Sequence, residues 1–297
     1  MIFKALKKVQ ISFLRVTNLE PGKPTSEKVS ASVISDSDGT RQQLEKLLIS
    51  DSDYDGLSSL REVLGQHDQV VHFFNHVSML SWIPAFTYYL NRISETGFGY
   101  RKWHLVYNPL FAKNPIMQRL IKLAGMNEHQ SYGGLLRGIR EKTITDLFVA
   151  PEGANCIFGK TEEIRPFITH MTLDLVLRTE MPLLLTVHQG SEAWSKSVKL
   201  SPRLLSLLEL VDQKIWRSIC FNKNKSLALL SNSPYLSWFH FPRRIASFRM
   251  KSELFPLDYA YYQSLSGNEI QEYLQEESEK IRQRMQAIYD GFDRTPL

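Results

Sequence analysis

The sequence predicts an α/β fold with a mostly parallel central sheet flanked by helices. Four short, strongly apolar runs stand at residues 70–74, 104–107, 146–150 and 183–187. Runs of this kind are typical of parallel strands that are covered on both faces. Segments with helical spacing separate most of these runs. The alternation is the βαβ rhythm from which a parallel sheet is built.

Several helices are expected between and after these strands. Asn114 and Pro115 provide an N-cap and a first-turn proline for a helix that Gly125 ends. Ser266 to Glu269 fits a capping box, and the apolar positions that follow predict a long final helix. One further helical pattern passes through Leu135 and Ile139, and another runs from about Phe167 to Leu177.

The N-terminal part has a different pattern, and we interpret residues 1–66 as a helical N-terminal extension and residues 67–297 as the α/β domain. Turn-like residues at 35–39 precede a helical pattern over 42–48, and a second pattern runs over 57–65. In the first fifteen residues, lysines interleave with apolar residues. This predicts a surface helix packed on the domain or a helix lying in a membrane interface.

Composition narrows the class of function. The chain has 297 residues, a formal net charge of +5 and only two cysteines, Cys156 and Cys220. The charge favours an anionic surface or substrate and is too weak to indicate nucleic acid. Two cysteines give no disulfide framework, and no apolar run is long enough to span a bilayer. We expect a cytoplasmic protein, peripheral on the inner face of a membrane, with no metal and no bound cofactor.

Polar residues follow two of the predicted strands. Asn75 and His76 follow the first apolar run, and Pro151, Glu152 and Gly153 follow the third. Parallel sheets bind ligands beyond the carboxyl ends of their strands. A histidine there is well placed as a general base, because its ordinary pKa of about 6.5 suits proton transfer at neutral pH.

Four blocks of residues, taken in order, resemble the glycerophospholipid acyltransferase family of the 1-acyl-glycerol-3-phosphate acyltransferase type. The blocks are Asn75-His76-x-Ser78, Asn114-Pro115 to Gly125, Phe148 to Gly153, and Met181 to Leu185. The resemblance covers roughly residues 69–290. It is carried by the order of the blocks, since each block alone is weakly specific.

The resemblance implies that the chain has the α/β fold of this family. It also implies that the protein transfers a fatty acyl group from an acyl-CoA or acyl carrier protein thioester to a hydroxyl acceptor, in lipid metabolism and phospholipid biosynthesis. It makes His76 the base and Glu152 the acceptor-binding group. Backbone amides near Gly153 are candidates for holding the oxyanion. The remaining expected substrate-binding residues are Asn75, Ser78, Pro151, Gly153, Ala154 and Asn155.

One departure concerns the base. The family's first motif ends in an aspartate five residues after the histidine, and Ser81 stands there. A hydroxyl can orient an imidazole but cannot stabilise its charge. The substitute partner of His76 is then Ser81, Ser78 or a carboxylate from elsewhere, of which Glu152 is the first candidate. The protein is accordingly a slow enzyme, an enzyme with a relocated carboxylate, or no enzyme.

A second departure concerns the acceptor. The family has an arginine about six residues after the glycine of its second motif and commonly another shortly after Pro-Glu-Gly, and both are missing here. Arginine suits phosphate because its planar fork donates two parallel hydrogen bonds. We therefore expect a lipid-like acceptor other than a simple lysophosphatidate. Two alternatives stay open: a degenerate homologue that binds lipid or acyl chains without turnover, and an unrelated α/β protein such as a partner-binding module.

Overall fold

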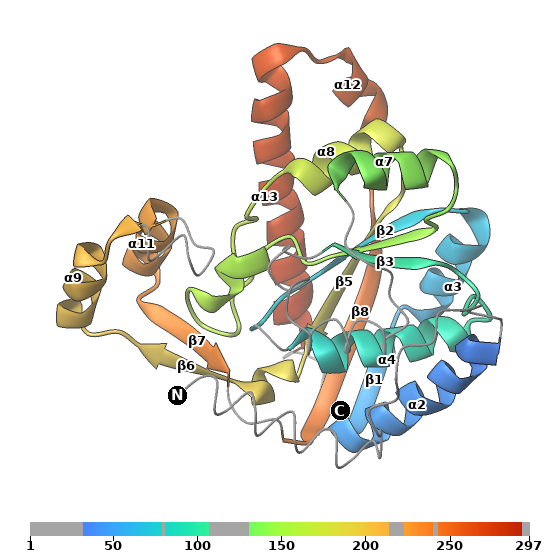
Figure 1. The fold of residues 1–297 in the computed structure, drawn as a ribbon, viewed down its shortest axis with the longest axis horizontal. Helices are drawn as coiled ribbons and strands as arrows, with labels where there is room; N and C mark the ends of the chain where they lie inside the picture. Colours follow the sequence, from blue (N-terminus) through green and yellow to red (C-terminus); the bar gives the residue numbers. More distant parts are fainter. Residues whose placement is uncertain (1–31, 79–80, 107–130, 214–222, 240–242, 293–297) are drawn as a thin grey trace, which may run out of the picture.

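The computed structural model describes residues 32–78, 81–106, 131–213, 223–239 and 243–292. These residues form a mixed six-stranded sheet with helices on both faces, and a separate two-stranded sheet (Figure 1). The predicted α/β class is confirmed. The helix expected from Asn114 to Gly125, the N-terminal segment of interleaved lysines and Cys220 lie outside the described residues.

The main sheet has the strand order β1-β8-β5-β2-β4-β3. Its strands are β1 (Ile49–Asp55), β2 (Val70–Phe74), β3 (Trp103–Val106), β4 (Asp146–Val149), β5 (Leu183–Gln189) and β8 (Ile245–Phe255). Strands β5, β2, β4 and β3 are parallel, while β8 runs antiparallel to β5 and parallel to β1. The four predicted strands are therefore confirmed, and the carboxyl ends of β5, β2 and β4 meet at one edge.

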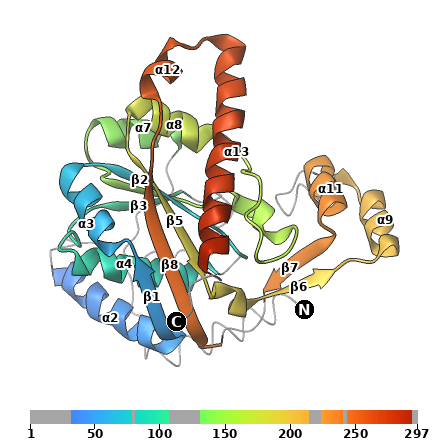
Figure 2. The same ribbon diagram turned by 180° about the vertical axis from the view of Figure 1, so that it is seen from behind.

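Helices cover both faces of the main sheet, and its central strand β2 carries apolar side chains on each face. Val71 and Phe73 belong to the core under α7, α8 and α13, whereas Val70 and Phe74 belong to the core under α3 and α4. Figures 1 and 2 show the two layers from opposite sides. The helices are α2 (Ser32–Leu48), α3 (Leu57–Gln66), α4 (Trp82–Glu95), α7 (Tyr132–Arg140), α8 (Met171–Thr179), α12 (Tyr259–Ser264) and α13 (Gly267–Phe292).

The long final helix begins as predicted. The Ser266 backbone N–H donates to Glu269 Oε2 at 3.1 Å, which is the reciprocal bond of a capping box. Ile281 and Met285, on the predicted apolar face, are fully buried against the sheet. Helix α13 therefore closes the face of the sheet that α7 and α8 also cover.

The predicted helical N-terminal extension contains a strand, at residues 49–55, that the sequence did not predict. These residues form β1, whose partners on β8 run from Ile245 to Lys251. The turn-like residues 35–39 lie inside α2. Strand β1 is an edge strand with mostly exposed side chains, so it lacks the apolar pattern by which buried strands are recognised. The described part of the predicted extension thus contributes to the main sheet.

A second unit, which we call the arm, comprises residues 195–213 and 223–239. It contains β6 (Ser195–Lys199), α9 (Pro202–Leu210), α11 (Lys223–Asn232) and β7 (Tyr235–Phe239). Figures 1 and 2 show the arm projecting to one side of the main sheet. A small apolar core of Phe158, Leu200 and Leu230 joins it to the loop after β4. Within the described part of the chain, every helix is too short or too polar to cross a bilayer.

Candidate functional site

The site expected from the sequence lies at the carboxyl edge of β2, β4 and β5. Strand β2 pairs with both β4 and β5, so the segments that follow these strands are neighbours. The His76 backbone N–H donates to Glu152 Oε2 at 2.6 Å. The structure therefore brings together the two motifs that the sequence separates by about seventy residues.

The imidazole of His76 is held through one nitrogen. Its Nδ1 lies 3.3 Å from the Gly153 carbonyl oxygen, and because a carbonyl only accepts, Nδ1 is the protonated nitrogen in this bond. Nε2 then carries the free lone pair, and no described residue hydrogen-bonds to it. The side chain is partly exposed, whereas its neighbours Asn75 and Val77 are buried. This is the tautomer that a general base needs.

The environment of His76 makes it a weak base. Although the side chain is partly exposed, desolvation by the protein around it lowers the pKa of His76 to about 4, and the hydrogen bond to the Gly153 carbonyl opposes that shift only in part. The ring has no carboxylate partner among the described residues. His76 is accordingly neutral at physiological pH, and the imidazolium formed by proton uptake has no adjacent negative charge to stabilise it.

Glu152 has a different contact from the one expected. Its carboxyl is buried and accepts the backbone N–H groups of His76, at Oε2, and of Arg165, at Oε1 and 3.2 Å. Burial raises the pKa of Glu152 to about 8, against the effect of these two bonds and of the Arg165 guanidinium. Glu152 therefore fixes the backbone at His76, and the expectation that it replaces the missing aspartate on the ring is not met.

Asn75 joins the ends of β2 and β5. Its side-chain amide accepts from the His188 N–H at 2.8 Å and donates to the His188 carbonyl at 2.9 Å. The His188 Nε2 in turn donates to the Asn75 carbonyl at 3.0 Å, and the Ser191 hydroxyl lies 3.1 Å from its Nδ1. Burial lowers the pKa of His188 to about 3. Asn75 is therefore a structural bridge that sets the position of the next residue, His76.

His188 was not among the residues expected at the site. The one available signal was its place directly after the apolar run 183–187, at the same edge as Asn75. A histidine at a strand end more often satisfies local hydrogen bonds than it performs chemistry, and His188 does form such bonds.

Ser81 and Ser78 form a turn before α4. Ser81 Oγ accepts from the Ser78 N–H at 2.9 Å and donates to the Ser78 carbonyl at 3.0 Å. Both side chains are fully buried, and within the described residues neither is hydrogen-bonded to His76. The hydroxyl of Ser81 thus stabilises the turn, and the structure gives it this role in place of orienting the ring. Ser78 Oγ is buried without a hydrogen-bond partner in the described part of the chain.

The segment after β4 is held by its own backbone. The Pro151 carbonyl accepts from the Ile168 N–H at 3.0 Å, and Asn155 Nδ2 donates to the Pro166 carbonyl at 2.9 Å. Gly153 has a positive φ of 49°, as expected of a tight turn. Its N–H donates to the Ala150 carbonyl at 3.0 Å, so this amide is not free to hold an oxyanion.

Two other residues of this segment bear on the site. Ala154 belongs to the short helix η1 (Gly153–Ile157), but its side chain lies outside the described atoms. Cys156 is buried, and burial raises the pKa of its thiol well above the ordinary value. The thiol is therefore protonated and unreactive at neutral pH.

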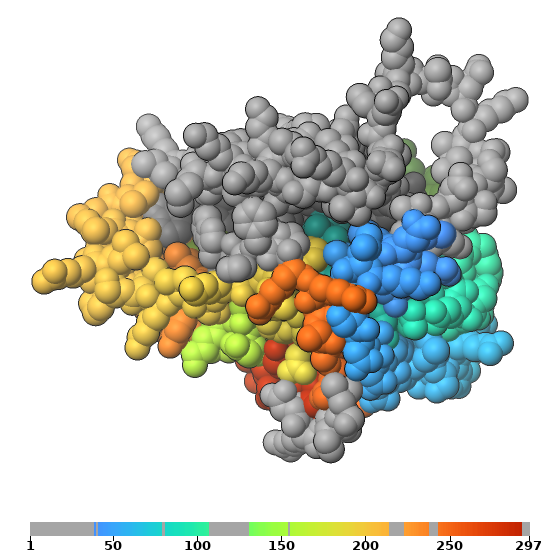
Figure 3. Space-filling model, turned by 90° about the horizontal axis from the view of Figure 1, so that it is seen from below, coloured from blue at the N-terminus to red at the C-terminus, as the bar shows by residue number. Residues whose placement is uncertain are grey.

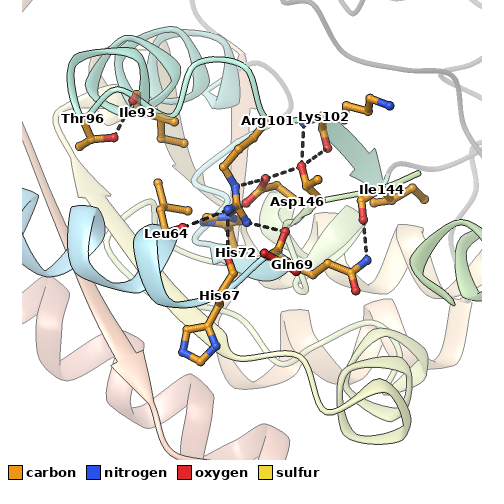
Figure 4. Close-up of polar contacts among 12 residues, drawn as sticks. Leu64, His67, Gln69, His72, Ile93, Thr96, Arg101, Lys102, Ile144 and Asp146 are labelled. Carbon is orange, nitrogen blue, oxygen red and sulfur yellow. Dashed lines mark hydrogen bonds and ion pairs between the residues drawn. The ribbon is translucent and has the colours of Figure 1, made fainter. Parts of the chain in front are cut away.

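Within β2, His72 lies in a buried charged cluster. His72 Nε2 lies 2.9 Å from Asp146 Oδ1 and its Nδ1 lies 2.9 Å from the Tyr89 hydroxyl. Arg101 Nε donates to Asp146 Oδ2 at 2.6 Å, while its other nitrogens donate to the carbonyls of Leu64, His67 and Asp68 (Figure 4). Both ring nitrogens of His72 are thus occupied. This cluster was not expected from the sequence.

No protein-family model matches this chain, and a search of the curated proteins gives no significant match. Among the described residues, no group of three or more histidine, cysteine or acidic side chains is arranged to hold a metal ion. The family resemblance therefore rests on the ordered motifs alone and stays a prediction.

Proposed function

We propose that the protein is an acyltransferase that moves a fatty acyl group from an acyl-CoA or acyl carrier protein thioester to a hydroxyl acceptor. The acceptor we propose is a lipid other than a simple lysophosphatidate. The observation that carries the proposal is the fixed tautomer of His76, whose Nδ1 donates to the Gly153 carbonyl and whose Nε2 keeps a free lone pair among the described residues. The order of the sequence motifs supports the choice of reaction.

In this reaction, His76 Nε2 takes the proton of the acceptor hydroxyl while the hydroxyl oxygen attacks the thioester carbonyl carbon. The resulting tetrahedral intermediate collapses, the carbon–sulfur bond breaks, and the thiolate leaves with the electron pair. The protonated His76 then gives its proton to the thiolate, so that the products are an ester, a thiol and neutral histidine. A pKa of about 4 makes His76 a weak base but its imidazolium a ready proton donor.

Glu152 and Asn75 act as positioning residues in this proposal. Glu152 holds the His76 backbone N–H, and Asn75 fixes the end of β2 against β5. Two buried contacts thus determine where the Nε2 lone pair points. Small displacements of a reacting group cost large factors in rate, so this support has catalytic value.

The second candidate is a homologue that binds acyl chains without turnover. It is favoured by one observation, namely that no described carboxylate contacts the ring of His76. A catalytic base without a carboxylate partner lacks the group that stabilises its protonated form. The two candidates differ in whether the thioester is consumed.

The test is acceptor-dependent release of free thiol from palmitoyl-CoA by the purified protein, measured with a panel of hydroxylated lipids. His76→Gln keeps a polar side chain of similar size but removes the base, and we expect a loss of about 10²- to 10⁴-fold. His67→Gln is the matched control, since His67 precedes β2 and therefore lies near the amino end of the strand, whereas His76 follows its carboxyl end. The control is expected to stay within about twofold of the original protein.

Release that needs both an acceptor and His76 would support the acyltransferase. Release that His76→Gln leaves unchanged would contradict the assignment of the base. Absence of release with every acceptor, together with measurable binding of palmitoyl-CoA, would favour the second candidate.

A further inference from the structure

Helix α9 on the arm exposes an apolar surface. Leu204, Leu207 and Leu210 are 42%, 59% and 80% exposed, and no residue of α9 is buried. Val198 on the neighbouring strand β6 is 46% exposed. Single exposed leucines are ordinary, but a contiguous apolar patch marks a surface that meets another apolar phase.

The exposed leucines sit on a firmly built helix. Ser201 Oγ accepts from the Leu204 N–H at 3.3 Å, and Pro202 occupies the first turn. On the opposite side of α9, Leu205 and Leu208 pack against the small core that joins the arm to the loop after β4. The outward side of the helix is therefore presented in a fixed orientation.

Cations accompany the leucines. Arg203 precedes Leu207 by four residues and Leu210 by seven, so all three lie on one side of α9. On β6, Lys196 and Val198 are exposed on one face of the strand, whereas Lys199 is exposed on the other face. The described arm carries five lysines and arginines against two acidic residues. Leucines that share a surface with cations are the composition of a helix that lies on an anionic bilayer.

We propose that α9 and β6 form a docking surface for an anionic lipid bilayer. The leucines enter the boundary between headgroups and acyl chains, and Lys196 and Arg203 contact lipid phosphates. Figures 1 and 2 show α9 at the outer end of the arm, and Figure 3 shows the arm, in yellow and orange, extending beyond the rest of the described surface. This proposal does not depend on the acyl-transfer chemistry.

The test is sedimentation of the full chain with vesicles of phosphatidylcholine alone and with vesicles that contain about 30% phosphatidylglycerol. The original chain is expected to bind the anionic vesicles more strongly, and less so at high salt, because salt screens exposed charges. Substituting Leu204, Leu207 and Leu210 together by serine is expected to lower partitioning about 100-fold. Lys196→Gln with Arg203→Gln is expected to lower it about fivefold per charge on anionic vesicles only.

The matched control is Leu47→Ser with Leu254→Ser, two leucines of similar exposure, 54% and 45%, that lie outside the arm. This control is expected to bind vesicles like the original chain. Circular dichroism of every variant shows that the fold is kept. Equal vesicle binding by the triple serine variant would overturn the proposal. So would a change in oligomeric state without a change in lipid binding, which would show that a second copy of the chain covers α9.

Discussion

A histidine within β2, His72, and a histidine just after its carboxyl end, His76, differ in their hydrogen-bond partners. His72 is fully buried with Asp146 on one ring nitrogen and Tyr89 on the other. His76 follows the end of the same strand, is partly exposed, and is held at Nδ1 by the Gly153 carbonyl. A catalytic histidine is expected to have a carboxylate partner. Here the carboxylate, Asp146, contacts His72, whose two ring nitrogens both have partners.

The difference separates stability from chemistry. A buried imidazole needs partners on both nitrogens, because an unsatisfied buried polar atom costs free energy. A base needs one nitrogen without a partner. His72 meets the first condition and His76 the second. We infer that the charged cluster around Asp146 holds the sheet together, and that the neutral contacts around His76 keep a lone pair available.

The largest expected effect is on the buried cluster. Asp146→Asn leaves the buried Arg101 guanidinium without its counter-charge, although its bonds to three carbonyls remain. We expect the free energy of unfolding, measured by urea denaturation, to fall by about 3–5 kcal/mol. The matched control is Asp68→Asn, which removes the exposed ion pair with Lys142 and is expected to cost less than about 1 kcal/mol. Equal costs for the two substitutions would contradict the structural role of the buried cluster.

The next effect concerns the Asn75 bridge. Asn75→Ala leaves the buried N–H and carbonyl of His188 without their partners, and we expect a loss of about 1–3 kcal/mol in unfolding free energy. Because the bridge also positions His76, acceptor-dependent thiol release is expected to fall about 100-fold. Asn91→Ala is the control, since Asn91 is equally buried, at 3%, and bonds to Glu45 away from the site. If both variants lower thiol release equally, Asn75 has no special role in positioning.

A smaller effect is expected on the pH dependence of stability. The pKa values of Glu152 and Glu192 are raised by burial, to about 8 and about 7, so the folded state keeps protons that the unfolded state has released above pH 4.5. The contribution of each carboxyl to stability is therefore expected to fall as pH rises from about 4.5, by at most about 1.4 kcal/mol per pH unit, until the pH reaches about 7 for Glu192 and about 8 for Glu152. Denaturation at several pH values measures the slope. Glu152→Gln is expected to flatten it, and an unchanged slope would show that Glu152 is ionised at neutral pH.

The centre of the fold was easier to predict from the sequence than its edges. Strands β2 to β5 are buried on both faces, and strands of this kind are recognised in a sequence as short apolar runs. Strand β1 carries Asp51, Asp53 and Asp55 and lies at the sheet edge, where charged side chains are compatible with a strand. Its pairing with β8 depends on residues almost two hundred positions away, which no local pattern records.

The candidate site shows the same limit. The motifs placed His76 and Glu152 together at the carboxyl ends of the strands. The partner of the His76 ring is a backbone carbonyl, and because every residue has one, the sequence does not indicate which carbonyl it is. The Asn75–His188 bridge and the turn made by Ser81 are likewise contacts with backbone groups. Residue types predicted which segments meet, whereas the detailed hydrogen bonds followed only from the folded chain.

The most direct test of the account is a ¹⁵N NMR titration of the histidine rings, with His76 assigned through His76→Gln. We expect His76 to carry its proton on Nδ1 and to titrate with a pKa of about 4, well below the ordinary value, because burial disfavours the imidazolium and the ring is held by a neutral carbonyl. A proton on Nε2, or a pKa of about 7 of the kind a carboxylate partner produces, would contradict the account of His76 as a base held by the backbone alone.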